Sequence, residues 1–295
     1  MKSGFVSIVG RPNVGKSTLL NNLLNMHLAI TSDKAGTTRN VIQGVYDDED
    51  SQIVFVDTPG IHKPSDKLST ILNRKAYNSV DNVDLVLFLV DASTNIKDAD
   101  LSVLNRLKEL ELPIILVLNK VDKVNKELLL NTIMEYSKLY DFSEIFPISA
   151  LKDKNMNSLI NTIKKYLPNN EKIFLDDTLT NISTDFYISE IIREKVLRKT
   201  HDEVPHSVTC VVESKEVKKD KVIINAVIVV DNLQHKKIIV GSHANMLKSI
   251  GMDARVDLEE YFNKKVYLSL FVKVIEDWKD KDNYLKELGL DDLEN

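Results

Sequence analysis

The chain has 295 residues, enough for two domains, and its 43% apolar and 28% charged residues are typical of a water-soluble globular protein. The formal net charge of −5 argues against indiscriminate nucleic-acid binding, and the single cysteine, Cys210, excludes an intramolecular disulfide and a cysteine-rich zinc site. A single cysteine, short apolar runs and the absence of a secretory pattern in the first residues predict a cytoplasmic protein.

The charge is not spread evenly. Residues 276–295 contain eight acidic and three basic side chains, which account for the whole negative excess. We therefore expect a neutral body followed by an acidic, solvated C-terminal tail at 277–295.

Strand-like and helix-like segments alternate through residues 1–167. The apolar runs at 84–91 and 113–119 are continuous, as expected for parallel strands that are buried on both faces. Further strands are predicted at 5–9, 41–46, 52–57 and 144–149, and helices at 16–24, 98–111, 126–140 and 155–167. This alternation predicts an α/β domain with a mostly parallel sheet.

The pattern changes after residue 167. Residues 168–184 show no firm period and are interpreted as a linker. The run at 238–240 resembles a strand that breaks at Gly241, and a helix is expected to stop at Gly251. Together with a helix at 185–200, strands at 207–213, 222–230 and 266–274, and a second helix near 253–263, these segments predict a small α+β domain at 185–276.

GRPNVGKS (10–17) matches a phosphate-binding loop and stands between a predicted strand and a predicted helix, the context that this motif requires. Gly10 and Gly15 allow backbone N–H groups to approach a phosphate. Lys16 supplies a cation for the β- and γ-phosphates, and the Ser17 hydroxyl can ligate Mg²⁺.

DTPG (57–60) follows the strand at 52–57. Asp57 at the strand end can hold Mg²⁺ through water, and the backbone N–H of Gly60 can face a γ-phosphate. Alone this tetrapeptide is a common turn, but after a phosphate loop it is a specific signal.

NKVD (119–122) follows a buried strand and predicts guanine specificity. The Asp122 carboxylate can accept from two guanine N–H groups that adenine lacks, so ATP would leave the charge unpaired. The aliphatic part of Lys120 can cover the base, and Asn119 is expected to brace neighbouring loops. A backbone N–H of SAL (149–151) can meet the guanine oxygen.

These motifs in this order resemble the translation-factor-like branch of P-loop GTPases. The resemblance implies that Thr38 contacts Mg²⁺ and the γ-phosphate, with Thr37 as the alternative, and that the switch segments lie near 28–44 and 58–78. It implies catalytic roles for Lys16, Thr38 and Gly60 and magnesium ligation by Ser17, Thr38 and Asp57. The implied nucleotide-binding residues are Asn13, Val14, Gly15, Lys16, Ser17, Thr18, Asp57, Gly60, Asn119, Lys120, Asp122, Ser149, Ala150 and Leu151.

Ile61 departs from the pattern of many GTPases, in which a glutamine after DxxG orients the attacking water. Isoleucine cannot do this, and His62 alone is more often solvated than catalytic. The chain resembles a GTPase subgroup that uses K⁺ in place of an arginine finger, which implies that Asn13 is a K⁺ ligand. We expect slow intrinsic hydrolysis that is faster in K⁺ than in Na⁺.

The second domain resembles a type II KH domain, a fold that clamps about four single-stranded nucleotides. Together with the first domain, its segments REKV, EVPHSV, IIVGSHANMLKSIG and VKVIEDW make the chain similar to the Era family of bacterial GTPases. The implied partners are the 3′ end of 16S rRNA and the 30S subunit during its biogenesis, without DNA. The resemblance also implies a monomer and peripheral contact with the cell membrane, for which the sequence offers no lipidation motif.

The resemblance places RNA contacts at the loop after Val240. The residues concerned are Lys236, Lys237, Gly241, Ser242, His243, Ala244 and Lys248. Ala244 stands where KH loops carry a second glycine, which predicts altered RNA affinity without its loss. Each lysine alone would suit a solvated face, whereas the three together favour RNA.

Two other functions fit parts of the sequence. In the first, a GTP switch uses its small domain to bind a protein or the membrane. In the second, the chain is a metabolic P-loop kinase, against which the NKVD segment and the paired switch segments argue.

Overall fold

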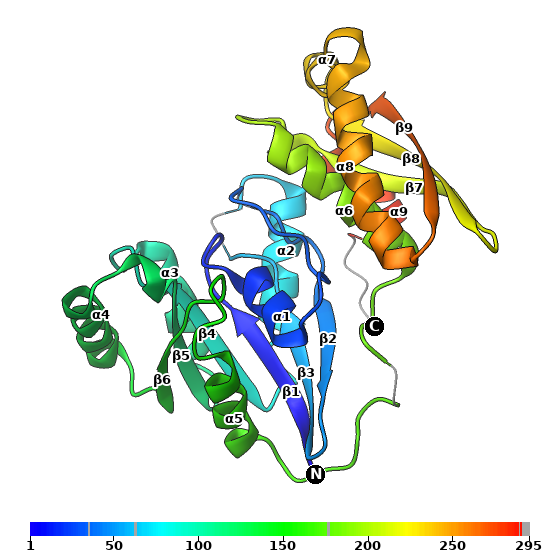
Figure 1. The fold of residues 1–295 in the computed structure, drawn as a ribbon. Helices are drawn as coiled ribbons and strands as arrows, with labels where there is room; N and C mark the ends of the chain where they lie inside the picture. Colours follow the sequence, from blue (N-terminus) through cyan, green and yellow to red (C-terminus); the bar gives the residue numbers. More distant parts are fainter. Residues whose placement is uncertain (35, 62–63, 176–177, 289, 291–295) are drawn as a thin grey trace. The chain divides into compact units, whose positions relative to one another are not determined.

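A computed structural model describes residues 1–295 except 35, 62–63, 176–177, 289 and 291–295 (Figure 1). The chain divides into two compact units. The N-terminal unit comprises residues 1–29, 38–65 and 72–181, and the C-terminal unit comprises 30–37, 66–71 and 182–295.

A six-stranded sheet forms the centre of the N-terminal unit, with the strand order β2-β3-β1-β4-β5-β6. All neighbouring strands are parallel except β2, which pairs antiparallel with β3. Every residue of β3, β4 and β5 is buried, as the continuous apolar runs predicted. The strands are β1 (Lys2–Val9), β2 (Ile42–Asp47), β3 (Ser51–Asp57), β4 (Leu85–Asp91), β5 (Ile114–Asn119) and β6 (Glu144–Pro147).

Helices cover both faces of this sheet. Apolar side chains of α2, α3 and α4 pack in one cluster with strand residues such as Phe88 and Leu116. Helices α1 and α5 lie together on the near side of the sheet in Figure 1. The helices are α1 (Lys16–Leu24), α2 (Lys67–Asn78), α3 (Asp98–Leu107), α4 (Lys126–Leu139) and α5 (Met156–Tyr166), and a 3₁₀ turn follows β5 at Val121–Lys123.

The segment interpreted as a linker is bound along the N-terminal unit in its described part. The Val45 amide donates to the Leu179 carbonyl at 3.0 Å. The side-chain oxygen of Gln52 accepts from the amides of Ile173 and Phe174 at 2.7 and 2.9 Å. Residues 173, 174 and 179 therefore satisfy polar groups of β2 and β3.

The C-terminal unit has a three-stranded sheet, ordered β7-β8-β9, in which β7–β8 is antiparallel and β8–β9 is parallel. Helices α6 and α8 cover one face, where Ile188, Ile224 and Leu258 share one apolar core. The elements are α6 (Thr184–Lys199), β7 (Thr209–Val217), β8 (Lys221–Val230), α7 (Leu233–Val240), α8 (Asn245–Phe262), β9 (Lys265–Val274) and α9 (Asp282–Glu287), with 3₁₀ turns at Pro205–Ser207, Ser242–Ala244 and Trp278–Asp280. The predicted order α-β-β-α-α-β is confirmed up to β9.

The positions of its two middle helices were predicted wrongly. Residues 238–240 end helix α7 and form no strand, and α8 continues through Gly251 to Phe262. A glycine inside a helix costs about 1 kcal/mol relative to alanine. Packing outweighs this cost, because Ile250, Ala254 and Leu258, on both sides of Gly251 in α8, are buried in the apolar core. Helix α2 was also missed, within the predicted second switch segment.

The described part of the C-terminal tail, residues 277–288 and 290, is anchored by apolar side chains, contrary to its prediction as a solvated segment. Trp278 is fully buried and donates from its indole nitrogen to the Ser207 carbonyl at 2.9 Å. Leu285 and Leu290 are also buried. This segment is acidic overall, but it contains three apolar side chains whose burial holds it against the domain.

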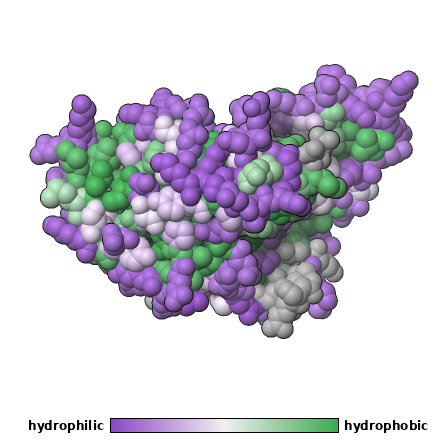
Figure 2. All heavy atoms as spheres, turned by 90° about the horizontal axis from the view of Figure 1, so that it is seen from below, coloured by the Kyte–Doolittle hydropathy of each residue, from purple (hydrophilic) through white to green (hydrophobic). Residues whose placement is uncertain are grey.

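Hydrophilic residues cover most of the molecular face seen in Figure 2. Each helix in the described part of the chain is too short or too polar to span a bilayer.

Candidate functional site

The phosphate loop connects β1 to α1, and Lys16 lies at its centre. Its ammonium group donates to the carbonyl oxygens of Gly10 and Arg11 at 3.0 and 3.1 Å. Burial lowers the pKa of Lys16 to about 8, while the neighbouring charge of Asp57 acts in the opposite direction. A buried cation that donates to two neutral carbonyls is well suited to a polyanionic ligand.

Two glycines keep the loop clear of side chains. Gly15 has φ of +104°, and a Cβ there would lie 2.4 Å from the side-chain nitrogen Nδ2 of Asn119. A Cβ at Gly60 would lie 2.8–2.9 Å from atoms of Pro12. Backbone of the DTPG turn and of the phosphate loop can thus approach each other and a ligand closely.

Ser17, Thr38 and Asp57 bring their oxygen atoms together. The Ser17 hydroxyl lies 2.8 Å from Asp57 Oδ2 and 2.8 Å from the Thr38 hydroxyl. Burial raises the pKa of Asp57 to about 6 despite the nearby Lys16 charge, and its buried Oδ1 has no hydrogen-bond partner among the residues that the structure describes. An orphaned carboxylate oxygen beside two hydroxyls fits Mg²⁺, which prefers oxygen ligands.

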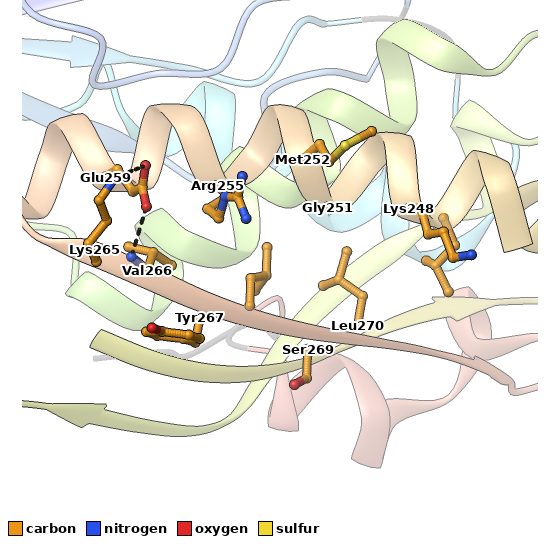
Figure 3. A pocket seen from close by; sticks show the side chains of 12 residues that line it. Lys248, Gly251, Met252, Arg255, Glu259, Lys265, Val266, Tyr267, Ser269 and Leu270 are labelled. Carbon is orange, nitrogen blue, oxygen red and sulfur yellow. Dashed lines mark hydrogen bonds and ion pairs between the residues drawn. The ribbon is translucent and has the colours of Figure 1, made fainter. Parts of the chain in front are cut away.

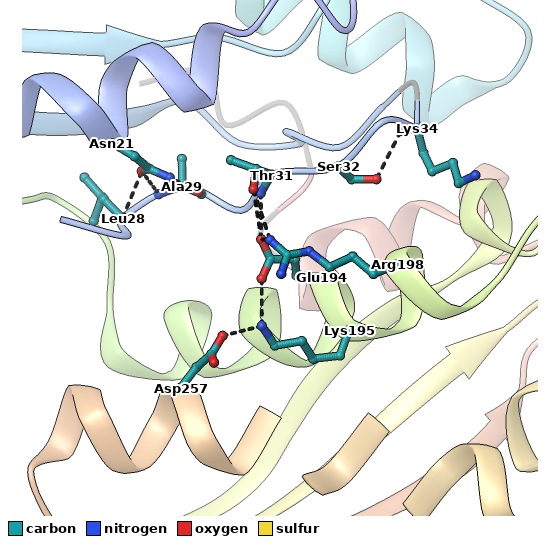
Figure 4. Close-up of polar contacts among 10 residues, drawn as sticks. All are labelled: Asn21, Leu28, Ala29, Thr31, Ser32, Lys34, Glu194, Lys195, Arg198 and Asp257. Carbon is teal, nitrogen blue, oxygen red and sulfur yellow. Dashed lines mark hydrogen bonds and ion pairs between the residues drawn. The ribbon is translucent and has the colours of Figure 1, made fainter. Parts of the chain in front are cut away.

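Thr37, the alternative to Thr38, is directed elsewhere. Its hydroxyl donates to the Lys34 carbonyl at 2.7 Å, and it belongs to the 30–37 segment of the C-terminal unit. Figure 4 shows Thr31 of that segment against Glu194 of α6, with the Thr31 amide 2.8 Å from the carboxylate. The predicted first switch segment, 28–44, is therefore divided between the two units.

Asn119 braces the loops of the predicted guanine site. It donates to the Val14 carbonyl at 2.8 Å and accepts from the Ala150 amide at 2.9 Å. Asp122 is exposed and accepts from the Ser149 hydroxyl at 2.6 Å, a hydrogen bond that lowers the pKa of its carboxyl. A carboxylate facing solvent and fixed in its charged form can accept from a base.

Lys120 has a partner that the sequence analysis missed. Its ammonium lies 2.7 Å from Asp91 Oδ2 and 2.7 Å from the Asn13 carbonyl. Burial alone would raise the pKa of Asp91, but hydrogen bonds from Lys120 and Ser93 lower it. Asp91 pairs with Asn119 in the register of β4 and β5. Both residues end neighbouring parallel strands, and this shared position in the sequence could have predicted that Asp91 lies near the NKVD turn.

Arg11 is a second missed brace. Its guanidinium lies 3.1 Å from Asp100 and donates to the Thr94 hydroxyl at 2.8 Å. This buried pair attaches the phosphate loop to the start of α3.

The remaining predicted nucleotide residues differ in exposure. Val14 is buried, Thr18 is half-buried, and Leu151 is 72% exposed, so only the backbone of Leu151 suits base recognition.

Ile61 is 5% exposed and packs in the core cluster with Ala76 and Phe88. It cannot orient a water molecule, while His62 lies outside the described residues.

The loop between α7 and α8 turns through three left-handed residues. Gly241 has φ of +69°, and a Cβ there would lie 2.8 Å from the Met246 Cβ. His243 and Ala244 follow with φ of +50° and +60°. This loop, exposed at Ser242 and His243, leads directly into the N-terminus of α8, where the helix dipole favours an anion.

The predicted RNA-binding lysines lie on both sides of this loop. Lys237 on α7 and Lys248 on α8 are exposed, and Lys236 is half-exposed. Ser242 and His243 are exposed at the tip. All seven predicted residues thus lie in one short helix–loop–helix segment.

A groove of about 720 Å³ lies between α8 and β9, and Lys248 lines it (Figure 3). Leu268 and Leu270 of β9 form apolar surface on the side that faces α8. Arg255 adds a second cation to the α8 wall.

This wall of α8 was not predicted from the sequence. Lys248, Met252, Arg255 and Glu259 follow one face of α8 at spacings of four, three and four. The signal was helical periodicity, which the predicted break at Gly251 concealed.

Comparison with known proteins agrees with both units. A family model described as a 50S ribosome-binding GTPase matches residues 5–120, and a KH domain model matches residues 203–279. The chain is 48% identical to GTPase Era of Geotalea daltonii, over 97% of each chain. It is 47% identical to GTPase Era of Clostridioides difficile, over 99% of each chain.

Two solved structures resemble the whole chain. Era of Aquifex aeolicus bound to GDP·AlF₄⁻ superposes with a TM-score of 0.95, and Era in complex with MgGDPNP and nucleotides 1506–1542 of 16S ribosomal RNA with 0.96. Each is 40% identical and aligns over 98% of this chain and 99% of its own. The chain belongs to the Era family of GTPases.

Proposed function

We propose that this GTPase binds the 3′ end of 16S rRNA through its C-terminal unit and assists small-subunit biogenesis under the control of GTP. The observation that carries the proposal is the Gly241–Ala244 loop, with Ser242 and His243 exposed at its tip, next to a groove lined by three cations, Lys248, Arg255 and Lys265. A relative of similar fold was solved with nucleotides 1506–1542 of 16S rRNA. The groove joins apolar surface for bases to cations for phosphates.

The N-terminal unit supplies the switch. Bound Mg²⁺ neutralises phosphate charge during hydrolysis. We assign its ligation to Ser17, Thr38 and Asp57, whose oxygens already converge. Lys16 contributes a cation to the phosphates, and the backbone N–H of Gly60 contributes a donor that senses the γ-phosphate.

RNA binding is tested by titrating the full-length protein with a pyrimidine-rich single-stranded RNA at several salt concentrations. We expect affinity to fall steeply with salt and to be lost in Lys248→Glu. Lys219→Glu, in the exposed β7–β8 turn, is the matched charge reversal and should retain most of the affinity. Equal binding by Lys248→Glu and the wild type would contradict the proposal.

A second candidate keeps the GTP switch and assigns the groove to a protein or to the membrane. The apolar floor of the groove, with Leu268 and Leu270, favours it. It would be supported if the wild type failed to bind RNA in the titration above.

Slow hydrolysis with a K⁺ requirement is part of the proposal. Ile61 is buried at the position where many GTPases orient water, and exposed Asn13 is assigned as the K⁺ ligand. Turnover should be higher in K⁺ than in Na⁺, and Asn13→Ala should remove the difference. Equal rates of the wild type in the two salts would contradict this assignment.

A monomer in the cytoplasm, with peripheral contact at the cytoplasmic face of the cell membrane, completes the proposal. Sedimentation velocity tests the monomer, and co-sedimentation with anionic vesicles tests the membrane contact. A dimer, or failure to sediment with vesicles at low salt, would contradict the respective assignment.

A further inference from the structure

The sheet of the C-terminal unit has one face that α6 and α8 do not cover. Residues alternate between faces along β8 and β9. Ile224, Ala226 and Leu270 belong to the core under the helices, so their alternates lie on the opposite face. We call that opposite side of β8 and β9 the outer face.

Two aromatic side chains stand exposed on the outer face of β9. Tyr267 is 60% and Phe271 is 59% exposed. Figure 3 shows Tyr267 and Ser269 on the side of β9 away from α8, whereas Leu270 points toward that helix. Aromatic rings exposed to this degree forfeit the stabilisation of burial, which favours a binding role.

Positive charge surrounds the two rings. Lys221 holds its ammonium 5.5 Å from the centre of the Tyr267 ring, and Lys265 pairs with Lys221 in the sheet register. Lys273 lies two residues beyond Phe271 on the same face and is exposed. Two acidic neighbours form ion pairs with lysines: Glu216 on β7 with Lys218, and Glu259 with Lys265.

The outer face and the groove lie on opposite sides of one strand, β9. Tyr267 and Ser269 are among the residues that line the groove, although their side chains lie on the outer face. Because β9 is the edge strand, a chain that leaves the groove needs to cross only this strand to reach Phe271.

We propose that the outer face of β9 is a second RNA contact, in which Tyr267 and Phe271 stack on unpaired bases beside the groove and the three lysines neutralise phosphates. This rests on the proposed RNA-binding function. Exposed aromatics on a sheet between lysines suit single-stranded nucleic acid, because every base presents a π-face. Stacking of this kind tolerates any base sequence. The outer face therefore adds affinity, while the groove determines which RNA sequence is bound.

The test compares two pyrimidine-rich RNAs in fluorescence anisotropy with the full-length protein. A tetranucleotide matches the capacity of the groove alone, and an RNA of about twelve nucleotides also reaches β9. Tyr267→Ala/Phe271→Ala should weaken binding of the longer RNA by about tenfold for each ring, and binding of the tetranucleotide by less than about twofold. Val256→Ala, an exposed apolar truncation on α8 outside the groove, should change neither.

Two further variants separate stacking from apolar contact. Tyr267→Leu/Phe271→Leu should lose affinity for the longer RNA as the alanine variant does. In Phe271→Trp, the new indole should be quenched by the longer RNA and not by the tetranucleotide, since Trp278, the only other tryptophan, is fully buried.

Each outcome decides one claim. Wild-type affinity of the alanine variant for the longer RNA would overturn the second contact while leaving the groove as an RNA site. Full affinity of the leucine variant for the longer RNA would overturn base stacking and show that apolar contact with the RNA is sufficient. Failure of both RNAs to bind wild-type protein would instead refute the proposed RNA-binding function itself.

Discussion

The ammonium of Lys120 lies 2.7 Å from the carboxylate of Asp91, so a residue at the end of β4 fixes the lysine of the guanine motif. The same ammonium reaches the Asn13 carbonyl at 2.7 Å. Three segments far apart in sequence, the phosphate loop, β4 and the NKVD turn, are thereby joined at one cation.

Replacing Asp91 should therefore impair nucleotide binding. Asp91→Asn keeps the shape of the side chain and removes the charge that orients Lys120. We expect the Kd for GTP and GDP to rise by about tenfold, the scale of one charge-assisted hydrogen bond. Isothermal titration calorimetry measures this, with exposed Asp98→Asn as the control. An unchanged Kd would show that Lys120 needs no such anchor.

Ile61→Gln should not create a faster enzyme. The side chain at 61 is 5% exposed in the core, so a glutamine there would bury an amide without approaching the phosphates. We expect turnover no higher than that of the wild type and an unfolding free energy lower by about 1–3 kcal/mol. Single-turnover hydrolysis and chemical denaturation provide the two values, with Ile61→Leu as the volume-conserving control. A higher rate in Ile61→Gln would mean that position 61 does face the nucleotide.

Ala244→Gly should stabilise the loop between α7 and α8. Ala244 has φ of +60°, a left-handed conformation that costs a non-glycine residue about 1 kcal/mol. The unfolding free energy of the C-terminal unit should rise by up to this amount, and RNA affinity should change by less than about threefold. Ala99→Gly in α3 removes the same methyl from a helical residue and should destabilise. A change in unfolding free energy of the same sign in both variants would contradict the left-handed conformation assigned to Ala244.

Acid should weaken the N-terminal unit partly through Asp48. Burial alone would raise its pKa, but hydrogen bonds from Lys164, Ser51 and Tyr46 hold it well below its ordinary value. A carboxyl with a depressed pKa in the folded state stabilises above its unfolded pKa, near 4, and loses this contribution as the pH falls further.

Asp48→Asn should accordingly lower the unfolding free energy at pH 7 by about 1 kcal/mol and flatten its decline below pH 4. Denaturation at a series of pH values measures both effects. Asp50→Asn removes the more exposed partner of Lys164 and should change stability by less than about 0.5 kcal/mol. A decline in Asp48→Asn as steep as that of the wild type would exclude Asp48 as the titrating group.

Neighbouring residues of the proposed nucleotide site could be predicted from the sequence because its motifs encode backbone geometry and ligand chemistry locally. Gly15, Lys16 and Ser17 follow one another in a single loop. Asp91 escaped prediction because it acts through a neighbouring strand and belongs to no motif. A helix was wrongly predicted to end at Gly251, because glycine has a low helix propensity. In the structure α8 continues through Gly251, and residues beyond it pack in the core. The groove was missed with it, since its α8 wall crosses Gly251.

The most direct test of the account is RNA binding by Gly241→Asp. An aspartate at 241 would meet Met246 and place a negative charge where phosphates should lie. The experiment is a titration of full-length protein, loaded with a non-hydrolysable GTP analogue, with RNA of the 16S 3′ end, alongside circular dichroism to confirm folding. We expect tight, salt-sensitive binding by the wild type and none by folded Gly241→Asp. Equal binding by both would contradict it.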